Sequence, residues 1–233
     1  LDDKIGGILD VLEMTRQEVT ILFGADHGDM LGERGLWFKM SFFEGAARVP
    51  LIIAAPEMAP GVVTPPVSTI DICPTLCNLA GISMAEFMPW THGESLVPLA
   101  SGGARRQAVA MEYAAEASYA PLVSLCSGWW KYIRCALDPE QLFNLETDPH
   151  ELCNLASNPQ YAKILEDLRD QSHALWDLDR FDAEIRESQV RRWVIYEALR
   201  EGSYYPWDFQ PLQKASERYM RNHMDLNDLE AKK

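Results

Sequence analysis

The sequence lacks any long apolar run and is poor in positive charge. No apolar stretch in its 233 residues approaches the ~20 residues that a helix needs to cross a bilayer, so we expect no membrane segment. Lysine and arginine number 21 against 35 aspartates and glutamates, which gives a net charge of −14. Because nucleic-acid-binding proteins neutralise phosphates with a basic stripe, this balance argues against a nucleic-acid partner.

The sequence also lacks a cysteine framework. The five cysteines are an odd number and form no Cys-x-x-Cys pair, and Cys73 and Cys77, four apart on one helical face, are typical of ordinary buried thiols. We therefore predict a reducing, cytoplasmic compartment. Residues 1–4 contain neither an initiator methionine nor the start of a signal peptide, and we interpret the chain as a fragment of a longer protein.

What the sequence does contain is typical of a soluble globular protein, with 47% hydrophobic and 24% charged residues. Apolar residues at helical spacing from Ile5 to Leu12 predict a helix. That helix leads into a β-branched strand at 19–23. The continuous apolar run at 49–54 indicates a strand buried on both faces. A helix is expected after Asp71, and an irregular connector over 83–104.

The pattern changes from about residue 108 onward. Short strand-like segments at 109–112, 129–134 and 141–144 predict a small antiparallel region. Asn158-Pro159 predicts the start of one helix, and another carries Trp193 and ends at Gly202. We expect three parts: an α/β part (1–106), an α+β subdomain (107–175), and a helix with an aromatic tail (176–233).

The most informative segment follows the strand at 19–23, where the chain turns at Gly24 into Asp26-His27-Gly28. In open α/β sheets, ligands bind beyond the carboxyl ends of the strands. A carboxylate and an imidazole at that edge are suitable ligands for a divalent metal. Lys39, twelve residues after His27, could return to the same place and hold an anionic substrate.

Simpler interpretations exist for each of these residues. Asp26 and His27 could form an ordinary surface turn, and Lys39 could be a solvated loop lysine. Arg48 is interpreted as an ion-pair partner of a residue such as Glu44. The neighbouring acidic residues Asp29 and Glu33 are interpreted as acceptors that stabilise the loop, and the loop glycines as positions of positive φ or close packing.

Three stretches together resemble the type I sulfatases, a family with the alkaline-phosphatase-like fold. They are Asp26-His-Gly-Asp-Met-Leu-Gly-Glu33 followed by Arg48-Val-Pro-Leu-Ile-Ile53, then Asp71-Ile-Cys-Pro-Thr-Leu-Cys-Asn-Leu-Ala-Gly81, then Gln141-Leu-Phe-Asn-Leu-Glu-Thr-Asp-Pro149 with Asn154-Leu-Ala156. The tail segments Tyr205-Pro-Trp-Asp-Phe-Gln-Pro211 and Ala215-Ser-Glu-Arg-Tyr-Met-Arg-Asn-His223 resemble those of the choline sulfatases.

The resemblance implies that residues 1–106 are the C-terminal part of a catalytic α/β domain, whose central mixed sheet is flanked by helices, and that a smaller α+β subdomain follows. It implies a divalent metal, Ca²⁺ or Mg²⁺ (or Mn²⁺), with Asp26 and His27 as metal-site residues. Many sulfatases have asparagine where this chain has His27, which could instead hydrogen-bond the hydrated nucleophile. Lys39 matches the family's sulfate-contacting lysine. With His27, it is our candidate catalytic residue.

The family's nucleophile is a formylglycine made within Cys/Ser-x-Pro-x-Arg, and this motif is absent from the chain. We therefore predict that the fragment alone is inactive. The tail is rich in aromatic residues, which could hold a quaternary ammonium ion by cation–π attraction or could simply bury the tail. Its substrate-binding candidates are Tyr219 and Asp225, and the resemblance implies a homo-oligomer formed through the tail.

The predicted function is hydrolysis of an alkyl sulfate, choline-O-sulfate above all, with a small sulfate ester as the only predicted partner besides a second copy. One alternative is a phosphonate monoester or phosphodiester hydrolase of the same superfamily. Another is a truncated remnant without catalytic activity.

Overall fold

The computed structural model describes residues 1–56, 58–104, 107–115 and 118–200. The chain divides into two compact units, residues 1–178 and 179–233. The finer three-part division expected from the sequence stays a prediction.

The first unit begins with helix α1 (Asp2–Thr15), which confirms the helix predicted around Ile5. Asp2 and Asp3 lie in its first turn, where carboxylates favour the positive end of the helix dipole. No residue of α1 is buried. Strand β1 (Ile21–Gly24) follows and pairs antiparallel with β4 (Leu51–Ala54), so that Leu22 lies opposite Ile53.

The prediction that the strand at 49–54 is buried on both faces was wrong for β4. Residues 21–23 of β1 are only half-buried, and β4 alternates between half-buried and exposed positions, with Ile52 61% exposed. The two strands cover each other's edges but leave one face of β4 open. Within the described ranges they form a two-stranded antiparallel sheet and not the mixed central sheet that was expected.

The glycine-punctuated loop between β1 and β4 has short structure of its own. Strands β2 (Met30–Leu31) and β3 (Trp37–Phe38) form an antiparallel pair around the 3₁₀ turn η1 (Glu33–Gly35), and the single-turn helix α2 (Glu44–Ala47) follows. Gly32 and Gly35 have φ values of 115° and 71°, conformations that residues with a side chain rarely adopt, as the sequence predicted.

Helix α3 (Ile72–Leu79) follows the 3₁₀ turn η2 (Thr69–Asp71) and confirms the helix expected after Asp71. Gly81, at φ 69°, lies just beyond its end. The next segment, expected to be irregular, contains two four-residue helices, α4 (Met84–Phe87) and α5 (Val97–Ala100). Helices this short bury few residues, so they leave little periodicity in the sequence.

A four-stranded antiparallel sheet follows in the order β5-β6-β7-β8. The predicted strands correspond to β5 (Val109–Tyr113), β7 (Trp130–Cys135) and β8 (Gln141–Asn144). The sequence prediction missed β6 (Leu122–Ser127). Its residues 123–126 are all buried, so the polar–apolar alternation that marks a one-sided strand is absent.

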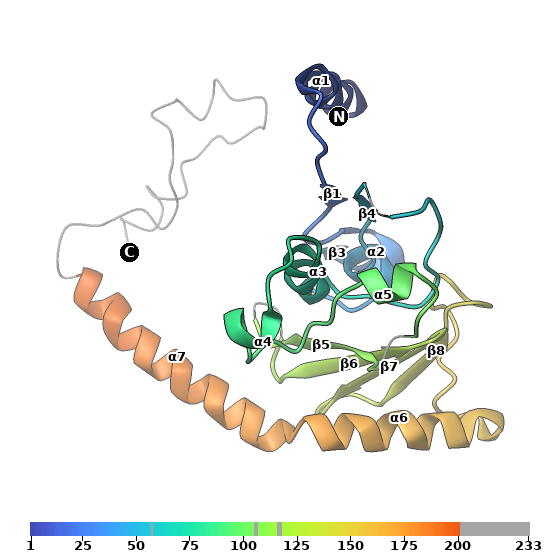
Figure 1. The fold of residues 1–233 in the computed structure, drawn as a ribbon. Helices are drawn as coiled ribbons and strands as arrows, with labels where there is room; N and C mark the ends of the chain where they lie inside the picture. Colours follow the sequence, from blue (N-terminus) through green and yellow to red (C-terminus); the bar gives the residue numbers. More distant parts are fainter. Residues whose placement is uncertain (57, 105–106, 116–117, 201–233) are drawn as a thin grey trace. The chain divides into compact units, whose positions relative to one another are not determined.

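This sheet is covered on both faces (Figure 1). Helix α6 (Ala162–Leu175), which follows the 3₁₀ turn η3 (Pro159–Tyr161), packs on one face with Leu165 and Leu168. On the other face Ile133 and Phe143 pack against Phe42 from the loop before α2. The core of the first unit therefore joins the loop that contains Lys39 to the C-terminal sheet.

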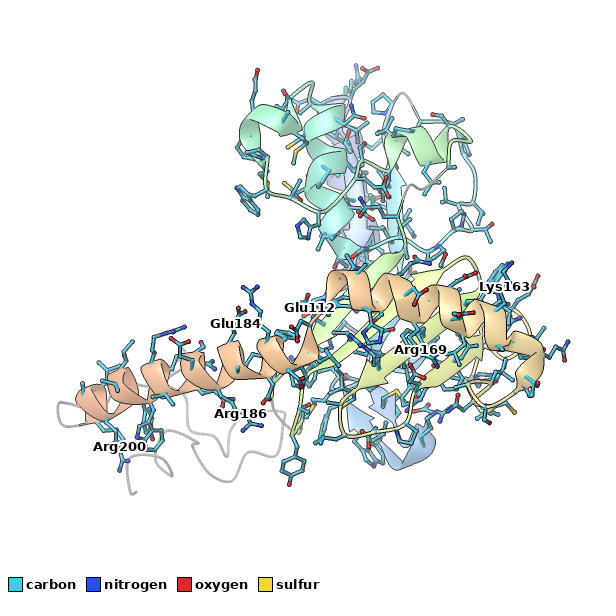
Figure 2. The ribbon with its side chains drawn as sticks, turned by 90° about the horizontal axis from the view of Figure 1, so that it is seen from below. Glu112, Lys163, Arg169, Glu184, Arg186 and Arg200 are labelled. Atoms are coloured by element: carbon cyan, nitrogen blue, oxygen red, sulfur yellow. The ribbon has the colours of Figure 1, made fainter. Side chains whose placement is uncertain are left out.

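The second unit is described only as far as residue 200. Its helix α7 (Leu178–Arg200) carries Glu184, Arg186 and Arg200, which Figure 2 labels, and has no buried residue. Across the described ranges, no helix combines the length and apolar character needed to cross a membrane. All five cysteines are free thiols; Cys77 is buried as expected, whereas Cys73 is only partly buried.

Candidate functional site

Asp26 and His27 lie just beyond the end of β1, as the sequence predicted. The backbone N–H of His27 donates to Oδ1 of Asp26 at 2.9 Å. This contact is the main reason that the pKa of Asp26 lies below its ordinary value, with smaller contributions from the charges of His27 and Lys39. The Asp26 side chain is 86% exposed, so its ionised oxygens face solvent.

The ring of His27 has a defined orientation. Its Nδ1 lies 2.9 Å from the carbonyl oxygen of Gly28, which can only accept, so Nδ1 carries a proton. In the neutral ring this leaves the lone pair on Nε2, which lies 3.5 Å from Oδ2 of Asp26. A backbone carbonyl that fixes the tautomer in this way is the usual support of a metal-ligating histidine.

Lys39 follows directly after β3, whose last residue, Phe38, lies opposite Met30 in the β2–β3 pair. The charge of Lys39 makes the smallest of the contributions that lower the pKa of Asp26. Asp26 and Lys39 are both exposed, and His27 is partly buried.

The loop that carries these residues is held by close backbone packing. The N–H of Gly28 donates to the carbonyl of Ala46 in α2 at 2.8 Å. A Cβ on Gly28 would lie 2.2 Å from the carbonyl oxygen of Gly45. Gly28 is therefore required for close packing, which confirms one of the two roles expected for the loop glycines.

The neighbouring charged residues have structural partners. Glu33 accepts a hydrogen bond from the N–H of Leu31 at 2.6 Å, and Arg48 lies 3.9 Å from Glu44. Both contacts agree with the simpler interpretations made from the sequence. Asp29 lies 4.0 Å from Nδ1 of His27, at the limit of an ion pair.

The residues present fit part of a divalent metal site. Asp26 offers hard carboxylate oxygens, which Ca²⁺ and Mg²⁺ prefer, and His27 offers one nitrogen. Elsewhere in the described ranges, as here, no three His, Cys, Asp or Glu side chains are grouped closely enough to hold an ion. Six or more oxygen ligands are usual for Ca²⁺, so Asp26 and His27 would supply only a fraction of the coordination shell.

The tail candidates Tyr219 and Asp225 lie outside the described residues.

The sequence interpretation missed a buried group below the loop, in which Lys131 contacts Glu44 and Glu151. One sequence feature could have indicated it. In the predicted strand 129–134, Lys131 and Ile133 are two positions apart and therefore lie on the same face, and a lysine beside a core isoleucine needs a buried partner.

Comparison with protein families matches two models to the chain. The C-terminal model of N-sulphoglucosamine sulphohydrolase covers residues 32–177. The model described as choline sulfatase enzyme C terminal covers residues 183–233. Together they include Lys39, the C-terminal sheet and the whole aromatic tail.

Individual relatives agree with these models. The choline-sulfatase of Rhizobium meliloti is 62% identical over the whole chain, which spans 46% of that protein. A phosphonate monoester hydrolase from Silicibacter pomeroyi has a TM-score of 0.63 at 30% identity, over 74% of this chain and 38% of its own. The structure of a protein in complex with its substrate, D-glucosamine-2-N,6-O-disulfate, has a TM-score of 0.63 at 25% identity, and the match covers 75% of this chain and 37% of that protein. The chain thus spans less than half of each of these proteins, and it belongs to the sulfatase family as a C-terminal region similar to that of choline sulfatases.

Proposed function

We propose that this chain is the C-terminal part of a sulfuric ester hydrolase that releases sulfate from an alkyl sulfate, choline-O-sulfate being the substrate. The observation that carries the proposal is the 62% identity to a choline-sulfatase over the full length of the chain. The local arrangement supports it, because a carboxylate and an oriented imidazole follow the end of a strand and the charge of Lys39 acts on that carboxylate.

In the proposed site, Asp26 is a metal ligand, and His27 either contributes Nε2 to the metal or accepts a hydrogen bond from the hydrated nucleophile. A divalent cation, when bound, would supply charge neutralisation at the sulfuryl oxygens. Lys39 would hold one of those oxygens by a charge-assisted hydrogen bond and offset the charge that develops there. The fixed Nδ1–H tautomer of His27 keeps Nε2 available for either role.

The nucleophile is proposed to be a formylglycine supplied by another part of the intact enzyme, since the chain has no Cys/Ser-x-Pro-x-Arg. We propose that β1 and β4 are part of the central mixed sheet of the alkaline-phosphatase-like fold there. The five free thiols support a reducing, cytoplasmic compartment. A homo-oligomer through the C-terminal region is supported by the apolar side chains that α7 leaves exposed, among them Trp193 and Val194.

The test is hydrolysis of choline-O-sulfate by the intact protein that contains this chain, with and without a metal chelator. We expect sulfate release that the chelator abolishes and that added Ca²⁺, Mg²⁺ or Mn²⁺ restores. The chain by itself is expected to be inactive. The Asp26→Ala variant should lose both bound metal and activity, whereas retention of full metal content and rate would contradict the assignment.

A phosphonate monoester or phosphodiester hydrolase is the second candidate, favoured by the TM-score of 0.63 to the Silicibacter enzyme. Measuring kcat/KM on sulfate, phosphonate and phosphodiester substrates in parallel separates the two. A preference for the phosphonate monoester would overturn the sulfatase proposal. Absence of turnover on every ester in a metal-loaded protein would favour the non-catalytic remnant.

A further inference from the structure

A buried cluster of charges lies between the C-terminal sheet and the loop that carries Lys39. At its centre is Lys131 of β7, whose side chain is 1% exposed. Its Nζ donates to the carbonyl of Phe42 at 2.8 Å, to Oε1 of Glu44 at 2.5 Å and to Oε1 of Glu151 at 2.9 Å. An ammonium group has three donors, so Lys131 uses all of them inside the protein.

Glu151 completes the cluster. Its side chain is 2% exposed, and its second oxygen, Oε2, accepts the backbone N–H of Glu44 at 2.7 Å. Glu151 also has φ 55°, a left-handed conformation that a residue with a side chain keeps only when its surroundings fix it. Lys131 and Glu151 therefore hold both a carbonyl and an N–H of the backbone over residues 42–44.

Burial lowers the pKa of Lys131, but the nearby Cys126, Glu151 and Glu44 raise it by more, so the ammonium stays charged. Buried ion pairs of this kind are often no more stabilising than apolar residues of the same volume. Here the charged groups fix the position of the loop, because Lys131 donates to the carbonyl of Phe42 and Glu151 accepts from the N–H of Glu44. The cluster is therefore better suited to positioning a segment than to holding the unit together.

The segment that the cluster holds, residues 42–44, connects to both parts of the candidate site, Lys39 and the Asp26–His27 pair. Phe42 lies three residues after Lys39, and the N–H of Ser41 between them donates to the carbonyl of Lys39 at 2.8 Å. In the other direction, Glu44 begins α2, whose Ala46 accepts from Gly28 at 2.8 Å. The metal-ligand candidates Asp26 and His27 immediately precede that glycine.

We propose that the Lys131–Glu44–Glu151 cluster is the positioning device of the site: it clamps residues 42–46 and so sets the relative positions of Lys39 and the Asp26–His27 pair. Its effect on catalysis rests on the proposed function, whereas its effect on loop order does not. The three residues touch no substrate. They act through the backbone of the loop.

The experiment is amide hydrogen exchange on the intact protein, comparing the wild type with the Lys131→Met and Glu151→Gln variants. Each variant removes hydrogen bonds to charged groups, so we expect exchange to accelerate by about tenfold or more over residues 26–30 and 39–47. Exchange in β5, β6 and β8 should change much less. Uniform acceleration over the sheet and the loop, or no change in the loop, would overturn the proposal.

The matched control is Tyr132→Phe, on the same strand. Tyr132 is fully buried on the opposite face, where its hydroxyl bonds to Glu140 under α6. This variant loses a buried hydrogen bond but should leave exchange over 26–30 and 39–47 unchanged. Equal acceleration in the control would show that any damage to β7 loosens the loop, and the proposal would fail.

A double variant, Lys131→Met with Glu151→Gln, separates positioning from stability and also covers failure of Lys131→Met to fold. It removes the unpaired buried carboxylate that the single change leaves at position 151, so we expect a melting temperature nearer to that of the wild type. Amide exchange over residues 39–47 should stay accelerated, because the carbonyl of Phe42 and the carboxylate of Glu44 still lack the hydrogen bonds that Lys131 donates in the wild type. Recovery of wild-type exchange in the loop would overturn the proposal.

Activity gives an independent readout. If the protein hydrolyses choline-O-sulfate, we expect the double variant to lower kcat by about tenfold or more with a smaller change in KM, because Lys39 is misplaced for the transition state. Unchanged kcat together with unchanged exchange would refute positioning and leave the sulfatase function standing. If the wild type hydrolyses no sulfate ester, the proposed function fails and exchange alone decides whether the cluster orders the loop.

Discussion

The N–H of Gly28 donates to the carbonyl of Ala46 at 2.8 Å, and this one bond joins the turn that contains Asp26 and His27 to helix α2. The two backbones come so close that a Cβ at position 28 would lie 2.2 Å from a carbonyl oxygen. Because α2 is fixed in turn by the sheet beyond it, the geometry of the candidate site depends on packing beneath it as much as on the residues in it.

Replacing Gly28 with alanine should therefore move the Asp26–His27 turn away from α2, since a backbone oxygen cannot yield as a flexible side chain can. We expect a loss of about 2 kcal/mol or more in the free energy of unfolding, measured by urea denaturation, and weaker metal binding in the intact enzyme. Gly61→Ala is the control, because a Cβ there has nothing within 4 Å. Equal stability of the two variants would contradict the close approach.

Lys39→Gln should lower kcat/KM for choline-O-sulfate by about 100-fold or more if Lys39 offsets charge on the sulfuryl oxygens, as the loss of a single oxyanion donor does elsewhere. The control is Lys163→Gln, which changes an exposed lysine on α6 (Figure 2). Steady-state kinetics on both variants checks this. A loss of similar size in the two would mean that net charge, and not the position of Lys39, is responsible.

Stability should fall at low pH because of Glu140. Its hydrogen bonds from Arg169 of α6, together with one from Tyr132, lower its pKa to about 2 from an ordinary 4.5. A depressed pKa stabilises the folded state above the unfolded value, and this contribution is lost as pH falls from 4.5 towards 2. Thermal melts across that range should show a smaller decline for Glu140→Gln than for the wild type, and parallel curves would exclude this cause.

Phe143→Ala should be among the most damaging apolar substitutions in the first unit. Phe143 is 1% exposed and packs against Phe42 and Ile133, between the sheet and the Lys39 loop. Removing a buried ring of this size costs about 3–5 kcal/mol in the free energy of unfolding, measurable by denaturant titration. Leu137→Ala, at a position that is 66% exposed, should cost far less.

The sequence alone determined the order of most elements and the candidate residues. The spacing of apolar residues and the residues that form turns are local properties of a sequence. They were enough to predict the helices that begin near residues 2, 72 and 159 and the position of Asp26-His27-Gly28 after a strand. The roles of Gly28, Glu33 and Arg48 also followed from residue type. The family was evident from contiguous motifs that need no knowledge of distant contacts.

Only the tertiary structure decided which distant residues meet. Strand β6 gave no alternation because both its faces are buried, and the exposure of Ile52 depends on what else packs on β4. The pattern of the strand at 129–134 indicates that Lys131 needs a buried partner, but nothing local identifies that partner as Glu44, 87 positions away. A buried charge is stable only where folding brings it a partner, so the support of the site, unlike its motifs, belongs to the fold.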